Sequence, residues 1–176
     1  VSENIRNGYM EVPLSDKVHR ATRRFDRVFW MGDLNYRING TREAVDKLLR
    51  RNDLKSLKKL LEHDQLNIER SKGNVFAEFR EGPLNFNPTY KYDNGTDDYD
   101  TSKKKRIPSW TDRILFYSAQ KDSIKILEYR SIDKLKISDH KPVVASFYAY
   151  INDATPKTTC SPTKTGETPS QVCAIS

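Results

Sequence analysis

The stretch Val28-Phe29-Trp30-Met31-Gly32-Asp33-Leu34-Asn35-Tyr36-Arg37 passes from four apolar residues, through a glycine, into a row of polar side chains. A short apolar run that ends at such a turn predicts a strand buried on both faces of a sheet. Asp33 and Asn35 then point the same way at the end of the strand, where open sheets hold ligands. A carboxylate there can take a proton from water, and a carboxamide can hold an oxyanion or the water itself. Because both residues are also ordinary turn formers, this segment alone leaves the two interpretations open.

Two amphipathic helices are predicted directly after this segment. Thr41 opens a helical pattern that ends at Asn52-Asp53, and its apolar residues share one face. Asp53 can cap a second helix, in which leucines recur every three or four residues and lysines take the opposite face. Further along the chain, three apolar segments bounded by polar residues predict strands at Ile114–Tyr117, Ile124–Leu127 and Val143–Tyr148.

The chain from Gly73 to Arg106 is long and irregular, with Pro83, Pro88 and Asn94-Gly95 as breaks. Compact domains rarely carry so much irregular chain without a functional reason, so we expect a binding loop. The loop ends in the basic run Lys103-Lys104-Lys105-Arg106. Taken alone, this run is better explained as a solvated basic surface or a nuclear localisation patch than as part of a binding site.

Two further polar clusters lead into predicted strands. In the cluster 106–115, Asp112 comes just before apolar residues, so we expect it to be half buried and to need a partner. That partner is either Arg113 or a histidine from another strand, and a simple surface ion pair with arginine is the competing explanation. In the cluster 138–143, the side chains of Asp139 and His140 diverge. His140 can then face a phosphoryl group while Asp139 faces water or a metal.

Composition limits the classes of protein to which the chain can belong. Its 176 residues suit one domain, and 31 Lys plus Arg against 24 Asp plus Glu give a formal net charge of +7. Such a charge attracts nucleic acid, anionic lipid headgroups or phosphorylated small molecules. No apolar run approaches the roughly 18 residues of a membrane span. Cys160 and Cys173 lie in a stretch rich in Thr, Ser and Pro, which favours a reducing compartment, cytosol or nucleus.

Together, these motifs resemble the signatures of the inositol polyphosphate 5-phosphatases. The resemblance implies an α/β fold, a two-sheet α/β sandwich of the endonuclease, exonuclease and phosphatase type. It also implies Mg²⁺-dependent hydrolysis of the 5-phosphate of phosphoinositides such as PtdIns(4,5)P₂ and PtdIns(3,4,5)P₃. It extends from about residue 25 to residue 148 and rests on Phe29–Arg37, Pro88–Asp93, Tyr99–Ser102, Arg106–Leu115 and Ser138–Val143.

The resemblance also implies a role for each matching catalytic position. Asp33 would activate the attacking water, and Asn35 would position the water and the phosphate. His140 would stabilise the phosphoryl oxygens while Asp112 orients its ring. Asp139 would stand beside the nucleophile or the Mg²⁺ ion, which makes it the candidate metal ligand of this chain.

Substrate selection is expected from the long loop. Tyr90, Lys91, Lys104 and Arg106 match residues that the family turns toward the neighbouring 4-phosphate, where cations favour a ring with two adjacent phosphates. The family's domain begins well upstream and takes its principal Mg²⁺ ligand from that part, for which residues 1–24 offer no match. We therefore expect residues 1–150 to be the C-terminal portion of the catalytic domain, weakly stable and nearly inactive alone.

Residues 151–176 are expected to form a flexible tail that ends in the prenylation pattern Cys173-Ala174-Ile175-Ser176. The same ending makes the chain most similar to the C-terminally prenylated phosphoinositide 5-phosphatases. One lipid chain binds membranes only marginally, so a second contact is needed. This contact would be the basic catalytic face, a palmitate on Cys160 or a prenyl-binding carrier protein. The expected location is cytoplasmic, on the cytosolic face of membranes.

Two other functions compete with this one. The Asp, Asn and Asp-His elements are shared with endonucleases of the same superfamily, although the segments at Tyr90-Lys91 and 106–108 favour the phosphatase and no nucleic-acid partner. A catalytically inactive phosphoinositide-binding module is the alternative of a different class, which the intact set of catalytic positions makes less favourable. Oligomeric state and the preferred inositol phosphate are not determined by the sequence.

Overall fold

The computed structural model of the protein describes residue 22, residues 25–151 and the backbone of residues 168–175. One strand is followed by three consecutive helices, and the later regular structure is all strand. In chain order the elements are β1 (Arg27–Asp33), α1 (Arg42–Leu49), α2 (Leu54–Leu61), α3 (Gln65–Ser71), β2 (Arg80–Glu81), β3 (Asp112–Ser118), β4 (Ile124–Ser131), β5 (Val143–Ile151) and β6 (Thr168–Ile175).

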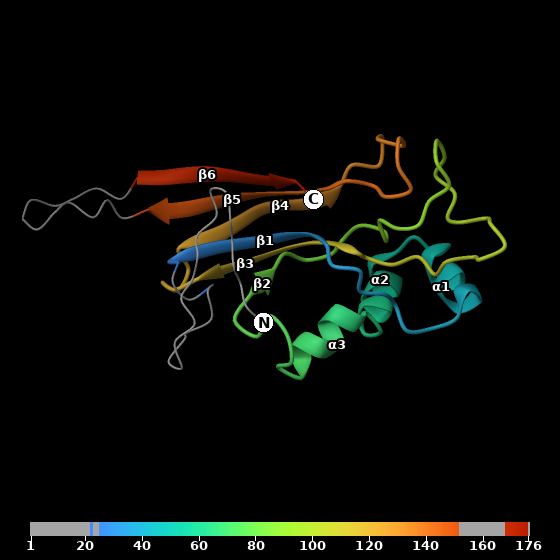
Figure 1. The fold of residues 1–176 in the computed structure, drawn as a ribbon, viewed down its shortest axis with the longest axis horizontal. Helices are drawn as coiled ribbons and strands as arrows, with labels where there is room; N and C mark the ends of the chain where they lie inside the picture. The colour runs from blue at the N-terminus through green and yellow to red at the C-terminus, as the bar shows by residue number, and fades with distance from the viewer. Residues whose placement is uncertain (1–21, 23–24, 152–167, 176) are drawn as a thin grey trace, which may run out of the picture.

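The strands form two antiparallel sheets of three strands each. The strand order is β1-β3-β2 in one sheet and β4-β5-β6 in the other. Figure 1 shows the sheets stacked as two layers, with the three helices grouped toward one end of the strands. Phe147 of β5 joins the layers, because its ring centroid lies 4.9 Å from that of Phe29 and 5.1 Å from that of Phe116. The predicted two-sheet α/β sandwich is confirmed.

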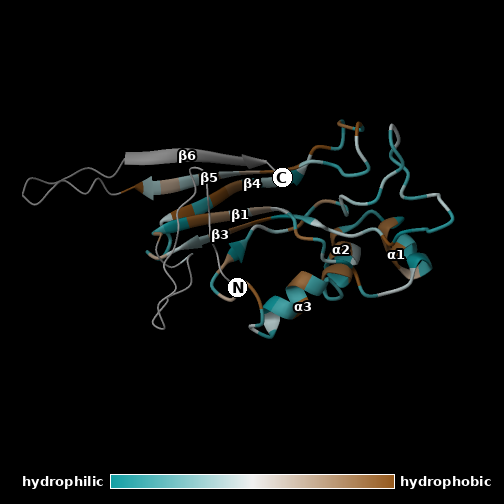
Figure 2. Cartoon of the chain, in the orientation of Figure 1, coloured by the Kyte–Doolittle hydropathy of each residue, from teal (hydrophilic) through white to brown (hydrophobic). Residues whose placement is uncertain are grey.

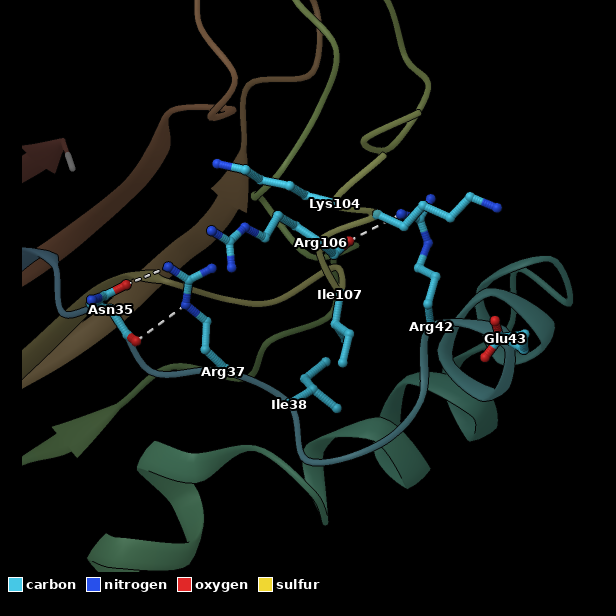
Figure 3. Close-up of a pocket in the computed structure, with 9 residues that line it drawn as sticks. Asn35, Arg37, Ile38, Arg42, Glu43, Lys104, Arg106 and Ile107 are labelled. Atoms are coloured by element: carbon cyan, nitrogen blue, oxygen red, sulfur yellow. Dashed lines mark hydrogen bonds between the residues drawn. The ribbon is translucent and has the colours of Figure 1, made fainter. Parts of the chain in front are cut away.

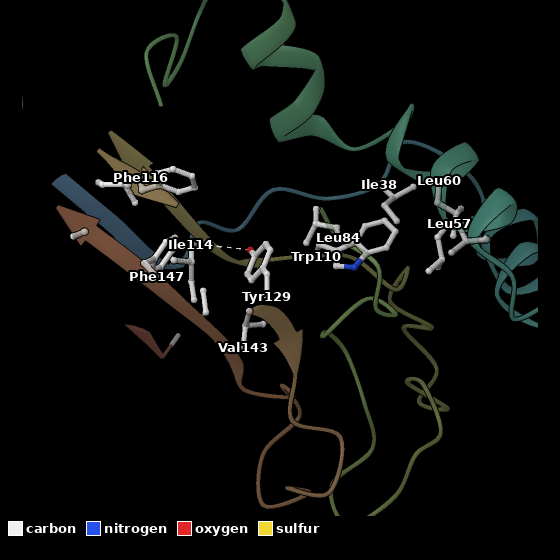
Figure 4. Close-up of a cluster of buried hydrophobic side chains, with 14 residues drawn as sticks. Ile38, Leu57, Leu60, Leu84, Trp110, Ile114, Phe116, Tyr129, Val143 and Phe147 are labelled. Atoms are coloured by element: carbon white, nitrogen blue, oxygen red, sulfur yellow. Dashed lines mark hydrogen bonds between the residues drawn. The ribbon is translucent and has the colours of Figure 1, made fainter. Parts of the chain in front are cut away.

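One apolar cluster runs from between the sheets to the underside of the helices (Figure 4). Ile114 and Phe147 are fully buried between the sheets, and Leu60 of α2 closes the helical end. Trp110 lies between these ends with no exposed surface, and its indole Nε1–H donates to the Phe86 carbonyl oxygen at 2.9 Å. Figure 2 shows hydrophobic colour along strands and helix faces, and hydrophilic colour over most of the connecting loops.

The expected burial of β1 on both faces is wrong. Trp30 and Met31 are 43% and 39% exposed. Among the described strands β1 pairs only with β3, so one edge and part of one face have no neighbour. The doubly covered strand is β3, whose residues 112–116 are all buried. An apolar run therefore marked a strand correctly, but it did not reveal the position of that strand in the sheet.

The two predicted helices are confirmed, together with their caps. The Thr41 hydroxyl accepts from the Ala44 amide at the start of α1, and the Asp53 carboxylate accepts from the Ser56 amide at the start of α2. The sequence analysis did not predict α3, because this helix has only seven residues and too few apolar positions to show a period. Within the described residues, no helix has both the length and the apolar character needed to cross a membrane.

The end of the chain differs from the expected flexible tail. Thr168–Ile175 form β6, which pairs antiparallel with β5 and brings Cys173 opposite Ser146. The edge of β5 explains why this segment pairs, since without β6 that edge would present unpaired backbone groups. An added edge strand satisfies these groups through its backbone and needs no apolar pattern of its own. The rest of the expected tail, with Cys160, lies outside the described residues.

Candidate active site

Asp112 and His140 form the centre of the site. Asp112 begins β3 and His140 lies three residues before β5, so the two sheets bring them together. The Asp112 Oδ2 atom lies 2.9 Å from His140 Nδ1 and also accepts from the hydroxyls of Thr89, at 2.8 Å, and Thr111, at 3.1 Å. Because a carboxylate only accepts, Nδ1 carries the proton of this contact. Of the two partners predicted for Asp112, the histidine is the one that the structure shows.

Arg113 lies on the opposite face of β3, because successive strand residues alternate. Its guanidinium donates to both carboxylate oxygens of Asp64, at 2.9 and 3.0 Å, and to both of Glu81, at 2.7 and 2.9 Å. All three side chains are almost completely buried. Arg113 therefore holds the helical layer against β3 and takes no part in the pairing of Asp112.

The pair is polarised toward its charged form. The hydrogen bond that His140 donates to Asp112, aided by the charges of Asp112, Asp139 and Asp33, raises the pKa of His140 against the opposing effect of burial. Burial acts to raise the pKa of Asp112, but its hydrogen bonds with His140 and Thr89 outweigh burial and the net shift is downward. An imidazolium held by a carboxylate is a suitable donor to a phosphoryl oxygen.

Asp33 and Asn35 reach the site through the pairing of β1 with β3. The register places Asp33 opposite Asp112, and the Leu34 amide donates to the Thr111 carbonyl at 2.8 Å. Asn35 then adopts a φ of 60°, and its amide donates to Asp33 Oδ1 at 2.8 Å. This turn exposes both side chains where the strand ends. The first predicted motif is thus both a turn and part of the site.

A stack of three side chains connects Asn35 to His140. The Tyr90 ring lies with its centroid 4.6 Å from that of His140, and the Arg37 guanidinium carbon lies 4.4 Å from the Tyr90 centroid. Arg37 also donates to the Asn35 side-chain oxygen. The predicted substrate residue Tyr90 therefore lies against His140 in the candidate site. The sequence analysis assigned no role to Arg37, Thr89 or Thr111.

Position in the sequence could have indicated two of these three residues. Arg37 follows Asn35 at the spacing of residues on one side of extended chain, and Thr111 is adjacent to Asp112. Thr89 gave no such signal, because it lies 23 residues from the carboxylate that it contacts. Its place depends on the path of the long loop.

Lys91 and Asp139 form an ion pair beside this cluster, with Nζ and Oδ2 2.8 Å apart. The hydrogen bond with Lys91 lowers the pKa of Asp139, and the same bond raises the pKa of Lys91. Both side chains are about one third exposed. Lys91 is thus close to the site, while its ammonium group is already engaged by Asp139.

A metal ion would need more oxygen ligands than this cluster offers. In the part of the chain that the structure describes, no three His, Cys, Asp or Glu side chains are grouped to hold one. Asp139 Oδ2 accepts from Lys91, which competes with a metal for that oxygen. The described residues do not by themselves fit a complete metal centre, and Asp139 as a metal ligand stays a prediction.

A cavity of about 630 Å³ adjoins Asn35 and Arg37 (Figure 3). Five cationic side chains and a single carboxylate line it, so it suits a polyanion. The predicted substrate residues Lys104 and Arg106 are among them, and the basic run therefore borders a cavity. The lining residues are Asn35, Arg37, Ile38, Arg42, Glu43, Lys104, Lys105, Arg106 and Ile107.

Arg42 of α1 holds the far wall of this cavity in place. Its guanidinium donates to the carbonyl oxygens of Tyr99, Asp100 and Arg106, at 3.3, 2.8 and 3.0 Å. Its Nε atom also pairs with both oxygens of Asp46, at 2.8 and 2.9 Å. The Asp100 carboxylate in turn accepts from the Arg106 amide at 2.7 Å. The backbone of the long loop is thereby held at Tyr99, Asp100 and Arg106, beside the basic run.

Comparison with known proteins gives one family for most of the chain. The family model described as "Endonuclease/Exonuclease/phosphatase family 2" matches residues 3–146. Phosphatidylinositol polyphosphate 5-phosphatase type IV of Rattus norvegicus is 43% identical over 135 residues, which are 77% of this chain and 21% of that protein. Type IV inositol polyphosphate 5-phosphatase 11 of Arabidopsis thaliana is 47% identical over 128 residues, or 72% of this chain and 38% of that protein.

Two solved structures with different bound ligands share the fold of this chain. The inositol polyphosphate 5-phosphatase domain of a synaptojanin, in complex with inositol (1,4)-bisphosphate and a calcium ion, matches with a TM-score of 0.64 and 37% identity over 85% of this chain and 36% of that one. A Cimex nitrophorin, as a ferrous NO complex, matches with a TM-score of 0.62 and 35% identity over 69% of this chain and 41% of that one. This chain spans about a fifth of the length of the first four curated relatives.

Proposed function

Because this chain belongs to the endonuclease/exonuclease/phosphatase family 2, we propose that the protein removes the 5-phosphate from inositol phospholipids. The observation that carries the proposal is the partly buried Asp112–His140 pair beside a cavity with five cationic side chains. Inositol polyphosphates are rigid polyanions that such a cavity can neutralise. The names of the relatives, one a phosphatidylinositol polyphosphate 5-phosphatase and one an inositol polyphosphate 5-phosphatase, support the same substrate class.

In the proposed reaction, water attacks the 5-phosphorus, and the bond from phosphorus to the inositol oxygen breaks. Asp33 takes a proton from the water, and the Asn35 amide orients the water against the phosphoryl group. His140 donates a hydrogen bond to a phosphoryl oxygen, where negative charge increases in the transition state. Asp112 holds the ring in that orientation through Nδ1. The leaving inositol oxygen takes a proton from solvent, and Asp33 returns its proton to solvent, so the products are inorganic phosphate and the inositol hydroxyl.

We further propose that a 4-phosphate next to the scissile group is bound by Tyr90, Lys91, Lys104 and Arg106. Lys104 and Arg106 line the cavity, and Tyr90 lies against His140. Lys91 must exchange its Asp139 partner for phosphate, which its exposed ammonium allows. The proposed substrates are therefore lipids with adjacent phosphates, PtdIns(4,5)P₂ and PtdIns(3,4,5)P₃.

Mg²⁺ is the proposed metal, supported by the calcium ion in the complex of the related synaptojanin domain. When bound, such an ion supplies Lewis-acid stabilisation of phosphoryl charge. Asp139 is the proposed ligand within this chain, and releasing it from Lys91 would be required for metal binding.

The first experiment measures phosphate release from a 4,5-bisphosphorylated inositol lipid by the intact protein, with Mg²⁺ or with EDTA. We expect metal-dependent release that His140→Ala abolishes. The matched control is His63→Ala, an exposed histidine beyond α2 that should leave the rate unchanged. A folded protein that binds the lipid without releasing phosphate would contradict the proposal.

A binding module is the second candidate, and the similarity to nitrophorin favours keeping it, since that protein forms a ferrous NO complex on this fold. Asp33→Ala separates the two functions. A phosphatase loses turnover and keeps lipid binding, whereas a binding module has no turnover to lose. Cleavage of abasic or plain DNA by the intact protein would instead support an endonuclease.

We also propose that Cys173 is prenylated and anchors the protein on the cytosolic face of membranes, with a prenyl-binding carrier as a partner. The support is the terminal sequence Cys173-Ala174-Ile175-Ser176. A prenyltransferase must reach this segment, so β6 must separate from its pairing with β5 for the transfer. Farnesyl incorporation in vitro, absent from Cys173→Ser and unchanged in Cys160→Ser, tests the site. Equal incorporation into Cys173→Ser would contradict it.

A further inference from the structure

The loop between β4 and β5, residues 132–142, presents two apolar side chains to solvent directly before the site. Ile137 is 90% exposed and Leu135 is 44% exposed, and His140 follows within a few residues. Single exposed apolar residues are common on protein surfaces, so their surroundings have to decide whether they matter. Water contact of an aliphatic side chain is nevertheless unfavourable, and burial in an apolar phase relieves it.

The loop is held rigidly from its base. The Lys141 ammonium is almost completely buried and donates to the Asp133 and Thr96 carbonyl oxygens and to Asp97 Oδ1, at 3.1, 3.3 and 3.1 Å. It also lies 4.7 Å from the centroid of the Tyr92 ring. These contacts tie the base of the loop to Asp133 within it and to Thr96 and Asp97 of the neighbouring loop. A loop held in this way needs less ordering when Leu135 and Ile137 dock.

A second set of contacts joins this loop to the loop that carries the basic run. The Gly95 amide donates to the Lys136 carbonyl at 2.8 Å, and Lys136 pairs with Asp97 at 2.5 Å. Figure 1 shows both loops projecting on the same side of the molecule, beyond the ends of the sheets. Figure 2 shows hydrophobic colour at the tip of the β4–β5 loop, next to the hydrophilic neighbouring loop.

Charge around the tip fits an anionic surface. Lys134 and the run Lys103–Arg106 are exposed, as are Asp98 and Asp133, whereas Asp97 and Asp139 are paired with lysines of the same two loops. Residues 82–111 and 132–142 together carry eight Lys and Arg against six Asp, so their formal charge is positive. An exposed aliphatic tip between lysines is the arrangement of segments that lie in the headgroup region of an anionic bilayer.

We propose that the β4–β5 loop inserts Leu135 and Ile137 into the surface of an anionic lipid bilayer and so places the site against the membrane. This proposal rests on the proposed function in one respect, since a lipid substrate is what makes such docking useful. The contact needs no prenyl group and no other protein. It would supply the second attachment that a single lipid anchor requires.

The binding test uses the intact protein as Cys173→Ser, so that prenylation cannot contribute. Flotation is measured with vesicles of phosphatidylcholine alone and of phosphatidylcholine with phosphatidylserine. We expect binding to the mixed vesicles, which falls about tenfold in Ile137→Ser and further in the double variant with Leu135→Ser. The matched control is Leu54→Ser, because Leu54 is 56% exposed at the start of α2, away from this loop in Figure 1.

A fluorescence measurement does not depend on the strength of binding. The tryptophan of Ile137→Trp should shift its emission to shorter wavelength when mixed vesicles are added, and that of Leu54→Trp should not, each compared with the unsubstituted protein. Two results would overturn the proposal. One is no vesicle binding by the Cys173→Ser protein without further substitutions, and the other is an equal loss of vesicle binding in Ile137→Ser and Leu54→Ser.

Turnover separates this proposal from the proposed function. Ile137→Ser should lower hydrolysis of vesicle-embedded substrate and leave hydrolysis of the soluble headgroup unchanged. If the unsubstituted protein hydrolyses neither substrate, the proposed function fails, while the flotation and fluorescence results still decide the membrane contact. A loss on the soluble headgroup equal to that on vesicles would overturn the docking role.

Discussion

The orientation of His140 depends on a single carboxylate oxygen. Asp112 Oδ2 contacts the imidazole and accepts from two threonine hydroxyls, one of them 23 residues away in the chain. The hydroxyls fill the remaining acceptor positions of that oxygen, so it has little freedom to move. Such packing of hydrogen bonds around a buried carboxylate is what keeps a catalytic ring in one orientation.

Asp112→Asn should therefore lower activity with little effect on folding. The amide keeps the size of the side chain but loses the charge that stabilises protonated His140. We expect phosphate release to fall about a hundredfold or more, while the protein still folds. Steady-state kinetics on the lipid substrate, with circular dichroism as the folding control, measures this. A rate within a factor of about three of the unsubstituted protein would rule out the orienting role.

The same pair predicts a pH dependence of stability. The pKa of His140 is raised above its usual 6.5. The contribution of His140 to the free energy of unfolding is therefore complete below pH 6.5 and disappears as pH rises through the folded-state pKa. Because the pKa of Asp112 is lowered from its usual 3.8, its contribution is complete above that value and disappears as pH falls through the folded-state pKa.

The unsubstituted protein should thus unfold at a higher temperature than His140→Ala. We expect this difference in unfolding midpoint to be largest between about pH 4 and pH 6.5 and to decrease above pH 6.5. Thermal unfolding across this range measures the difference. A difference that grows as pH rises above neutrality would contradict the assigned shift of His140.

At the scale of elements, the long loop after β2 is ordered by a helix. One guanidinium on α1 caps three loop carbonyls and is itself oriented by Asp46, one turn along the helix. This arrangement explains why a loop with few apolar residues can hold cations at fixed positions around a cavity. The position of Lys104 and Arg106 is thus determined by α1.

Arg42→Lys should loosen the loop, because one ammonium group cannot replace the fork that reaches all three carbonyls. We expect faster amide hydrogen exchange at residues 100–106 and a higher KM for the bisphosphorylated lipid, with a smaller change in kcat. Lys72→Met is the matched control, since its pair with Glu69 lies on the exposed end of α3. Unchanged exchange at these amides would show that other contacts hold the loop.

At the scale of the molecule, a buried ionic cluster joins the helical layer to both sheets. Arg113 of β3 contacts Asp64 at the start of α3 and Glu81 of β2, and the Tyr129 hydroxyl of β4 donates to Glu81 at 3.0 Å. Burial raises the pKa of Asp64 even beside the guanidinium, which shows that the charges are costly to bury. The cluster is therefore stable only while all its members are present.

Removing the cation should strongly destabilise the fold. Arg113→Met leaves two buried carboxylates unpaired, and we expect a loss of about 3–5 kcal/mol in the free energy of unfolding. Urea unfolding measures this, with Arg130→Met as the control because its pair with Glu128 is half exposed. The control should change the free energy by less than about 0.5 kcal/mol. Equal effects of both substitutions would contradict the role of the cluster.

Most individual elements were predictable from the chain alone. The helices at α1 and α2, their capping residues and the strands β3, β4 and β5 follow from local patterns of apolar residues and helix caps. Three motifs also indicated the residues of the site, since Asp33, Asn35, Tyr90, Asp112 and His140 do come together. Short-range patterns carry this information because helix caps and strand ends depend on neighbouring residues.

The tertiary structure alone decided which groups meet. Asp112 pairs with His140 and not with Arg113, because the side chains of Asp112 and Arg113 lie on opposite faces of β3. The exposed side of β1, the pairing of β6 and the stack of Arg37 on Tyr90 depend on strand order and on the path of a long loop. These features arise from contacts between segments far apart in the sequence. The secondary-structure propensity of a segment does not depend on which other segment it packs against, so it cannot predict that partner.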